Sequence, residues 1–131
     1  MLRRTCWSML LSALGLCGAP AFAADVGRYV LGDTRAETPG EVRPGLLLMG
    51  GGDRNFAALR WFMERAGHGH IVVLRASQAG EIGEEFYNEV GGIQSVETFV
   101  FNNREQAGDE RVLAALNRSD CIFIAGGDQS R

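Results

Sequence analysis

The stretch Cys121-Ile122-Phe123-Ile124-Ala125-Gly126-Gly127-Asp128-Gln129 joins a short apolar run to two glycines and a polar pair. An apolar run without alternation predicts a strand with both faces covered, which is typical of a parallel sheet. The glycines predict a tight turn with bare backbone amides. Such amides can stabilise an oxyanion, and the Gln129 side chain can hydrogen-bond a substrate carbonyl or carboxylate. The spacing by itself fits a plain glycine turn equally well.

Upstream of this stretch, apolar runs alternate with segments of helical spacing. The runs predict strands at 46–49, 71–74, 96–101 and 122–125. The helical spacing predicts helices at 56–66, 82–90 and around 112–116. Strand and helix alternate at roughly 25-residue intervals, which predicts right-handed βαβ units. The expected fold is therefore α/β, a three-layer sandwich built on a parallel sheet.

The ends of these elements carry their own signals. Asp53 is expected to cap the first helix, Gly67 to end it, and Gly91-Gly92 to end the second helix. A fully apolar fourth strand would be an exposed edge if nothing paired with it. The sheet is therefore expected to be incomplete at its C-terminal end.

Functional groups in such sheets gather at the carboxyl ends of the strands. Gly50-Gly51-Gly52 lies at the first of these ends and partly matches a dinucleotide fingerprint, which needs glycine at its first, third and sixth positions. The sixth position is Asn55, and the second strand ends in Arg75 and Ser77 where an acid is expected. An NADP site with Arg75 on the 2′-phosphate stays a minor alternative to a tight strand-to-helix turn.

Serine, histidine and cysteine are the other residue types here that could supply a reactive group. Ser77 lies at a strand end, but glycine is missing on both sides of it, so a helix cap or substrate contact is favoured over a nucleophile. His68 and His70 have no cysteine or acidic cluster beside them, so they are expected to be solvated loop residues and no metal site is predicted. Cys121 is expected to be a small buried apolar side chain.

The amino-terminal residues are typical of a secretory signal peptide. Two arginines precede a short apolar run, Trp7 to Cys17, and Ala21-Phe22-Ala23 forms an A-x-A cleavage site. A lipid anchor on Cys17 is disfavoured because Leu16 replaces the expected small residue. The predicted segments are a signal peptide at 1–23, a polar lead-in at 24–44 with a short extended piece at 29–31, and the first half of the α/β domain at 45–131.

Charge argues against a nucleic-acid partner. The net charge of the 131 residues is −3, and loss of Arg3 and Arg4 with the signal peptide makes it −5. No basic stripe remains that could follow a phosphate backbone. After signal cleavage no membrane segment is expected, and the oligomeric state stays open.

The run from 45 to 131 resembles the first half of a cyanophycinase-like serine peptidase. The matching landmarks occur in the right order and spacing: Gly45-Leu46-Leu47-Leu48-Met49-Gly50-Gly51-Gly52, the Phe62…Ala66-Gly67 helix end, Val72-Val73-Leu74-Arg75-Ala76-Ser77 and Phe123-Ile124-Ala125-Gly126-Gly127-Asp128-Gln129. Relatives of the dipeptidase E branch carry Asn where this chain has Gln129, which favours the cyanophycinase branch. Together the landmarks are fairly specific for this family, whereas each one alone is a weak indication.

The resemblance implies a flavodoxin-like fold similar to that of class I glutamine amidotransferases. It implies hydrolysis of an aspartyl peptide bond, as in cyanophycin, by acyl transfer through a serine and a histidine. No cofactor is implied. The resemblance assigns the substrate and oxyanion pocket to Gly127, Asp128, Gln129, Gly51 and Gly52, with Ser77 as a possible substrate contact.

The chain departs from the family pattern in one respect. The elbow of the type G-T-S-A-G and the histidine are expected after Arg131, so the 131 residues are expected to be inactive alone. Two alternatives remain, a non-catalytic exported binding domain on the same scaffold and a nucleotide-binding α/β module.

Overall fold

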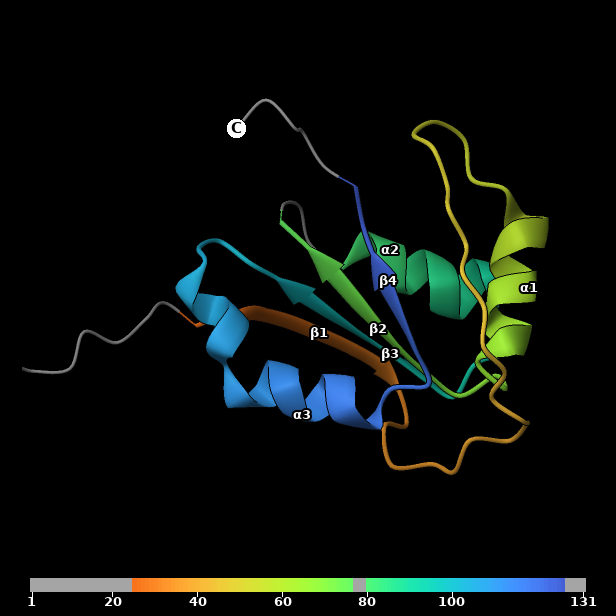
Figure 1. Ribbon diagram of the computed structural model, residues 1–131, viewed down its shortest axis with the longest axis horizontal. Helices are drawn as coiled ribbons and strands as arrows, with labels where there is room; N and C mark the ends of the chain where they lie inside the picture. Colours follow the sequence, from red (N-terminus) through yellow and green to blue (C-terminus); the bar gives the residue numbers. More distant parts are fainter. Residues whose placement is uncertain (1–24, 77–79, 127–131) are drawn as a thin grey trace, which may run out of the picture.

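The computed structural model describes residues 25–76 and 80–126 (Figure 1). These residues form one four-stranded sheet from β1 (Gly27–Gly32), β2 (His70–Arg75), β3 (Ser95–Val100) and β4 (Cys121–Ile124). The strand order is β1-β3-β2-β4. Strand β2 is parallel to β3 and β4, whereas β1 is antiparallel to β3. The α/β class is confirmed, but the sheet is mixed and open where a wholly parallel one was expected.

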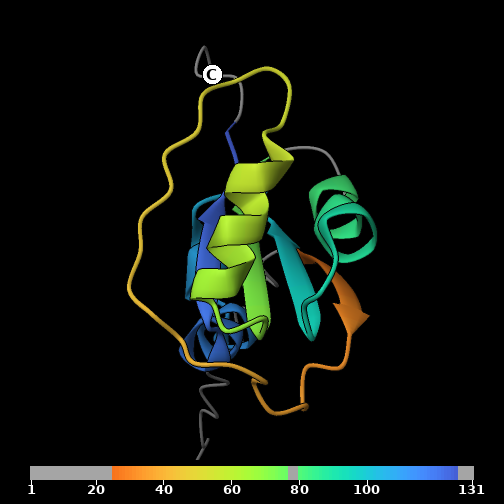
Figure 2. The ribbon, with the colours of Figure 1, turned by 90° about the vertical axis from the view of Figure 1, so that its right-hand side faces the viewer.

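Helices cover both faces of this sheet (Figures 1 and 2). One face carries α1 (Phe56–Arg65) and a continuous helix made of α2 (Glu81–Glu84) and the π-helical η1 (Glu85–Val90). The other face carries α3 (Glu110–Arg118), which follows a short 3₁₀ turn, η2 (Glu105–Gly108). The three predicted helices are therefore present.

Alternation along the central strands separates two hydrophobic clusters. Ile71 and Val73 face α1 and η1, while Val72 faces α3. Strand β3 divides in the same way, with Val96 in the first cluster and Phe99 in the second. This period of two follows from the pleat of a strand, and it buries β2 and β3 on both faces.

The predicted strand at 46–49 is not a strand in the structure. Leu46 and Leu48 are 79% and 84% exposed, while Leu47 and Met49 pack against the first hydrophobic cluster. Both edges of β2 are occupied, by β3 and β4, and the run does not pair with the outer edge of β4. Leu47 and Met49 partly bury their side chains without any strand pairing. Figure 2 shows this segment, in yellow, as an extended loop running outside the sheet.

Strand β4 is also less covered than its apolar sequence predicts. Phe123 packs edge-on against Phe86, with 4.9 Å between ring centroids, and against Phe62. On the opposite face, Ile122 and Ile124 are 45% and 76% exposed. The expectation that both faces are covered is therefore wrong within the described residues, because no element there packs over these two side chains.

The helix ends follow the predicted glycines but not the predicted cap. Gly67 and Gly91 adopt positive φ angles of 59° and 70° and end their helices, as expected. The N-cap of α1 is Asn55 rather than Asp53, since the Asn55 side-chain oxygen accepts a 3.1 Å hydrogen bond from the amide of Ala58. Asp53 lies too far before the first helical residue, Phe56, for the usual cap contact with the second or third helical amide.

Across the described ranges, none of the helices is long and apolar enough to cross a bilayer.

Candidate functional site

A pocket of about 630 Å³ lies where β2 and β4 end and the loop before α1 passes over them. In Figure 1 these two strands point toward the same edge of the molecule as that loop. The pocket is lined by the 45–54 segment, by Phe62, Arg75 and Ile82, and by the 122–126 segment. This is the position at which functional groups gather in open α/β sheets.

Glycine backbone borders the pocket on two sides. A β-carbon added at Gly50, Gly51, Gly52 or Gly126 would meet no atom within 4 Å, so open space lies beside each of them. Gly52 has a φ angle of 105°, a conformation that side chains with a β-carbon rarely adopt. A ligand can therefore approach bare backbone from both the loop and the end of β4.

Part of the predicted site falls within the described residues. Gly51 and Gly52 lie at the pocket together with Gly126. The other predicted site residues, Gly127, Asp128, Gln129 and Ser77, lie outside the described residues. The signal-peptide prediction for 1–23 lies outside them too.

Arg75 is a buried charged side chain at the pocket, where the sequence predicted for it only the minor NADP alternative. It is the last residue of β2 and falls on the same face as Ile71 and Val73, toward α1 and α2. Its side chain is 4% exposed, and its Nη1 atom lies 3.2 Å from Oε2 of Glu81. The signal was present in the sequence, because an arginine that ends an apolar strand stands at the functional edge of the sheet.

A second arginine and an acid line the loop side of the pocket. Arg54 forms an ion pair with Glu85 of η1, and Asp53 precedes it in the same loop. The charged side chains that line the pocket are thus Arg54, Arg75 and Asp53 among the described residues. Each arginine already pairs with a glutamate, Arg54 with Glu85 and Arg75 with Glu81, so an anionic group of a ligand would replace one of these contacts.

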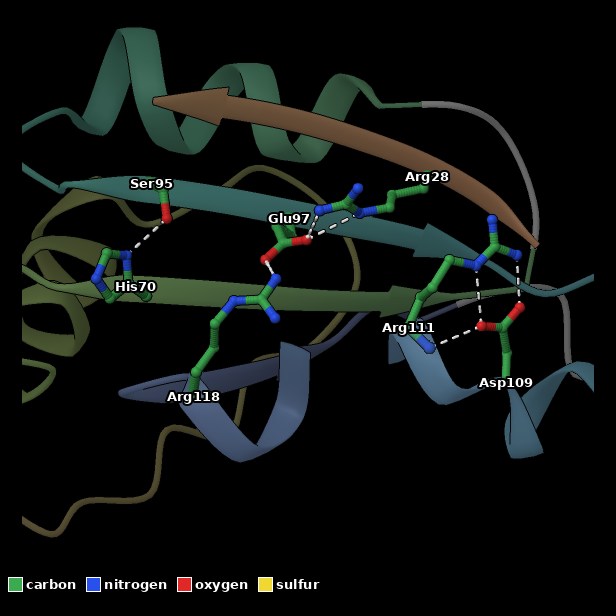
Figure 3. Close-up of polar contacts among 7 residues, drawn as sticks. All are labelled: Arg28, His70, Ser95, Glu97, Asp109, Arg111 and Arg118. Carbon is green, nitrogen blue, oxygen red and sulfur yellow. Dashed lines mark hydrogen bonds and ion pairs between the residues drawn. The ribbon is translucent and has the colours of Figure 1, made fainter. Parts of the chain in front are cut away.

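A serine and a histidine meet elsewhere in the fold, at the opposite end of the sheet. Nδ1 of His70 lies 2.8 Å from Oγ of Ser95, and Nε2 lies 2.7 Å from the carbonyl oxygen of Ala36 (Figure 3). Because a carbonyl can only accept, Nε2 donates to Ala36, and Nδ1 of the neutral ring accepts from Ser95. These contacts join the loop at Ala36 to β2 and β3. Because Ser95 is 1% exposed, at the amino end of β3, its hydroxyl is not accessible to a substrate as a nucleophile.

The expectation of two solvated loop histidines is therefore wrong for His70, which begins β2 and is partly buried. His68 is exposed, and its Nδ1 atom lies 2.8 Å from the carbonyl oxygen of Gly92. In the described ranges, no group of three or more His, Cys, Asp or Glu side chains is placed to hold a metal ion.

Cys121 packs against the first hydrophobic cluster and is partly buried. Burial, with a smaller contribution from the charge of Asp120, raises the pKa of the Cys121 thiol to about 12. A thiol with a raised pKa stays protonated at neutral pH and is a poor nucleophile. Cys121 is therefore a packing residue.

Comparison with protein-family models, with curated proteins and with solved structures found nothing that matches this chain.

Proposed function

We propose that this chain belongs to an exported serine-type hydrolase of the cyanophycinase type. Its fold would be the flavodoxin-like arrangement of class I glutamine amidotransferases. The observation that carries the proposal is the pocket at the carboxyl ends of β2 and β4, bordered by glycine backbone from Gly50–Gly52 and Gly126. The family resemblance assigns the substrate site to Gly51, Gly52 and 127–129, and of these Gly51 and Gly52 lie at this pocket.

The reaction would be acyl transfer on an aspartyl peptide such as β-aspartyl-arginine. Glycine amides at the pocket would stabilise the oxyanion of the tetrahedral intermediate, and Gln129 would hydrogen-bond a substrate carbonyl. None of the serines in the 131 residues has glycine two positions to either side, so none of them matches a nucleophile elbow. The chain itself would bind substrate without cleaving it.

The absence of an elbow serine also favours a second candidate, an exported binding domain that uses the same pocket. A nucleotide-binding module has less support. Asn55 caps the amide of Ala58, at the helix start where a pyrophosphate would be held in such a module.

The binding step can be tested directly on the purified chain by calorimetric titration with β-aspartyl-arginine. We expect saturable binding, no binding of NAD, NADP or ATP, and no release of free arginine. Failure to bind the dipeptide would overturn the peptidase assignment. Release of arginine that a serine-directed inhibitor blocks would show that a nucleophile is present after all.

Export makes a separate prediction about the amino terminus. Expression of residues 1–131 in a bacterium should yield a periplasmic or secreted product whose intact mass corresponds to a start at Ala24. Replacement of Ala23 by a bulky charged residue, Ala23→Arg, should block this cleavage, whereas Ala24→Ser should leave it in place. Retention of the full-length chain in the cytoplasm would contradict the localisation.

A further inference from the structure

We propose that Arg75 anchors a carboxylate group of the ligand in this pocket, and that Glu81 holds the same guanidinium in the ligand-free protein. The inference rests on the proposed function in that it names the chemical group the same site recognises. It is independent of hydrolysis, because it concerns a binding contact made by residues of this chain.

The surroundings of Arg75 are those of an anion site. Its side chain is 4% exposed, and it lies at the pocket with the apolar side chains of Phe62 and Ile82. A guanidinium in such a place is costly to leave without an anionic partner, and its attraction to a carboxylate is stronger there than in water.

Glu81 is a replaceable partner of Arg75. Glu81 begins α2, and its side chain is 67% exposed, in contrast to the buried arginine. An ion pair with one partner in solvent contributes little stability, because water competes for the exposed carboxylate. A ligand carboxylate entering from the pocket can therefore take over this contact at small cost.

The chemistry of the pocket favours a carboxylate over a phosphate. The planar fork of arginine matches a carboxylate in a bidentate contact. A phosphate dianion would gain most from the open amides of a helix start, but no residue of the first turn of α1 lines the pocket. Asp53 adds a negative charge to the lining of the pocket, which penalises a dianion more than a single carboxylate.

Succinate and its neutral isostere succinamide test the proposal on the unmodified chain. By calorimetric titration, succinate should bind at least about tenfold more tightly than succinamide, and phosphate should bind more weakly than succinate. In ¹H–¹⁵N spectra, the Nε–H signal of Arg75 and the amides of Gly51 and Gly126 should shift as succinate is added. Equal affinity for succinate and succinamide would overturn the proposal.

Three substitutions then test the roles of Arg75 and Glu81 separately. Arg75→Lys keeps the charge but loses the fork, so succinate should bind at least about tenfold more weakly, with folding verified by circular dichroism. Glu81→Gln removes the competing carboxylate and should tighten succinate binding about two- to fivefold. Glu84→Gln is the matched control, because it makes the same charge change on an exposed residue of α2 and should leave affinity unchanged.

The outcomes separate this inference from the proposed function. Succinate binding that depends on Arg75, without binding of β-aspartyl-arginine, would support the anchor and reject the peptidase assignment. Binding of β-aspartyl-arginine with the same affinity in the folded Arg75→Lys variant would reject the anchor and leave the peptidase assignment standing. Glu81→Gln and Glu84→Gln variants of equal affinity would reject the role given to Glu81.

Discussion

Replacement of Phe86 by alanine is expected to lower the free energy of unfolding by about 3–5 kcal/mol. Phe86 is fully buried in η1, where it packs in the first hydrophobic cluster. Its ring meets that of Phe123 nearly at right angles, at 82°, with 4.9 Å between the centroids. The truncation removes buried apolar surface, leaves a cavity and loses this edge-to-face contact, so three unfavourable effects act together.

Chemical denaturation followed by circular dichroism measures this loss. Leu113→Ala is the matched control, because Leu113 is 47% exposed on α3 and its truncation should cost less than about 1 kcal/mol. If Phe86→Ala and Leu113→Ala destabilise the chain equally, then η1 does not pack on the sheet as described. Because Phe86 holds η1 against β4, its loss should also disturb the pocket end of β4.

Loss of the Glu97 carboxylate is the second large expected effect. Glu97 is 3% exposed at the centre of the sheet, on the face covered by α3. It accepts hydrogen bonds from Nη2 and Nε of Arg28 at 2.6 and 2.9 Å, and it pairs with Arg118 of α3 (Figure 3). One carboxylate thus joins β1, β3 and α3.

Glu97→Ala should lower the free energy of unfolding by about 2–3 kcal/mol. Removing one member of a buried pair costs about 3–5 kcal/mol, but both arginines are more than a third exposed and can be hydrated in the variant, which reduces the loss. Arg28→Gln should cost less, because Arg118 still pairs with Glu97. A loss below about 0.5 kcal/mol in urea denaturation of Glu97→Ala would mean that the network contributes no more than an exposed ion pair.

A second ion-pair cluster in Figure 3 differs from that of Glu97 because it is exposed. A hydrogen bond from Arg111 lowers the pKa of Asp109 to about 2, and Arg111 also pairs with Asp25. A carboxylate with a lowered folded pKa stabilises the folded state above its ordinary pKa and loses that contribution as pH falls toward the lowered value. The cluster therefore stabilises the folded state at neutral pH, and this stabilisation is lost in strong acid. Its size is small because the cluster is exposed to solvent.

Local periodicity was enough to predict most of the elements. Strands β2, β3 and β4 and the helices α1, α2–η1 and α3 lie within a few residues of their predicted bounds, since each follows an apolar pattern with the right period. The predicted glycine positions Gly51 and Gly52 also lie at the pocket. These features depend on neighbours in sequence, which a pattern can report.

The α/β class, the helix faces and the two glycine segments can be predicted from sequence, because periodicity and backbone freedom are local properties. Three features follow from packing instead: the 46–49 run is not a strand, β1 joins the sheet antiparallel, and Arg75 pairs with Glu81. Each of these depends on which element occupies a strand edge or packs over a strand end. Apolar runs compete for the same edges with similar hydrophobic gains, so their partners are chosen by the packing of the whole sheet.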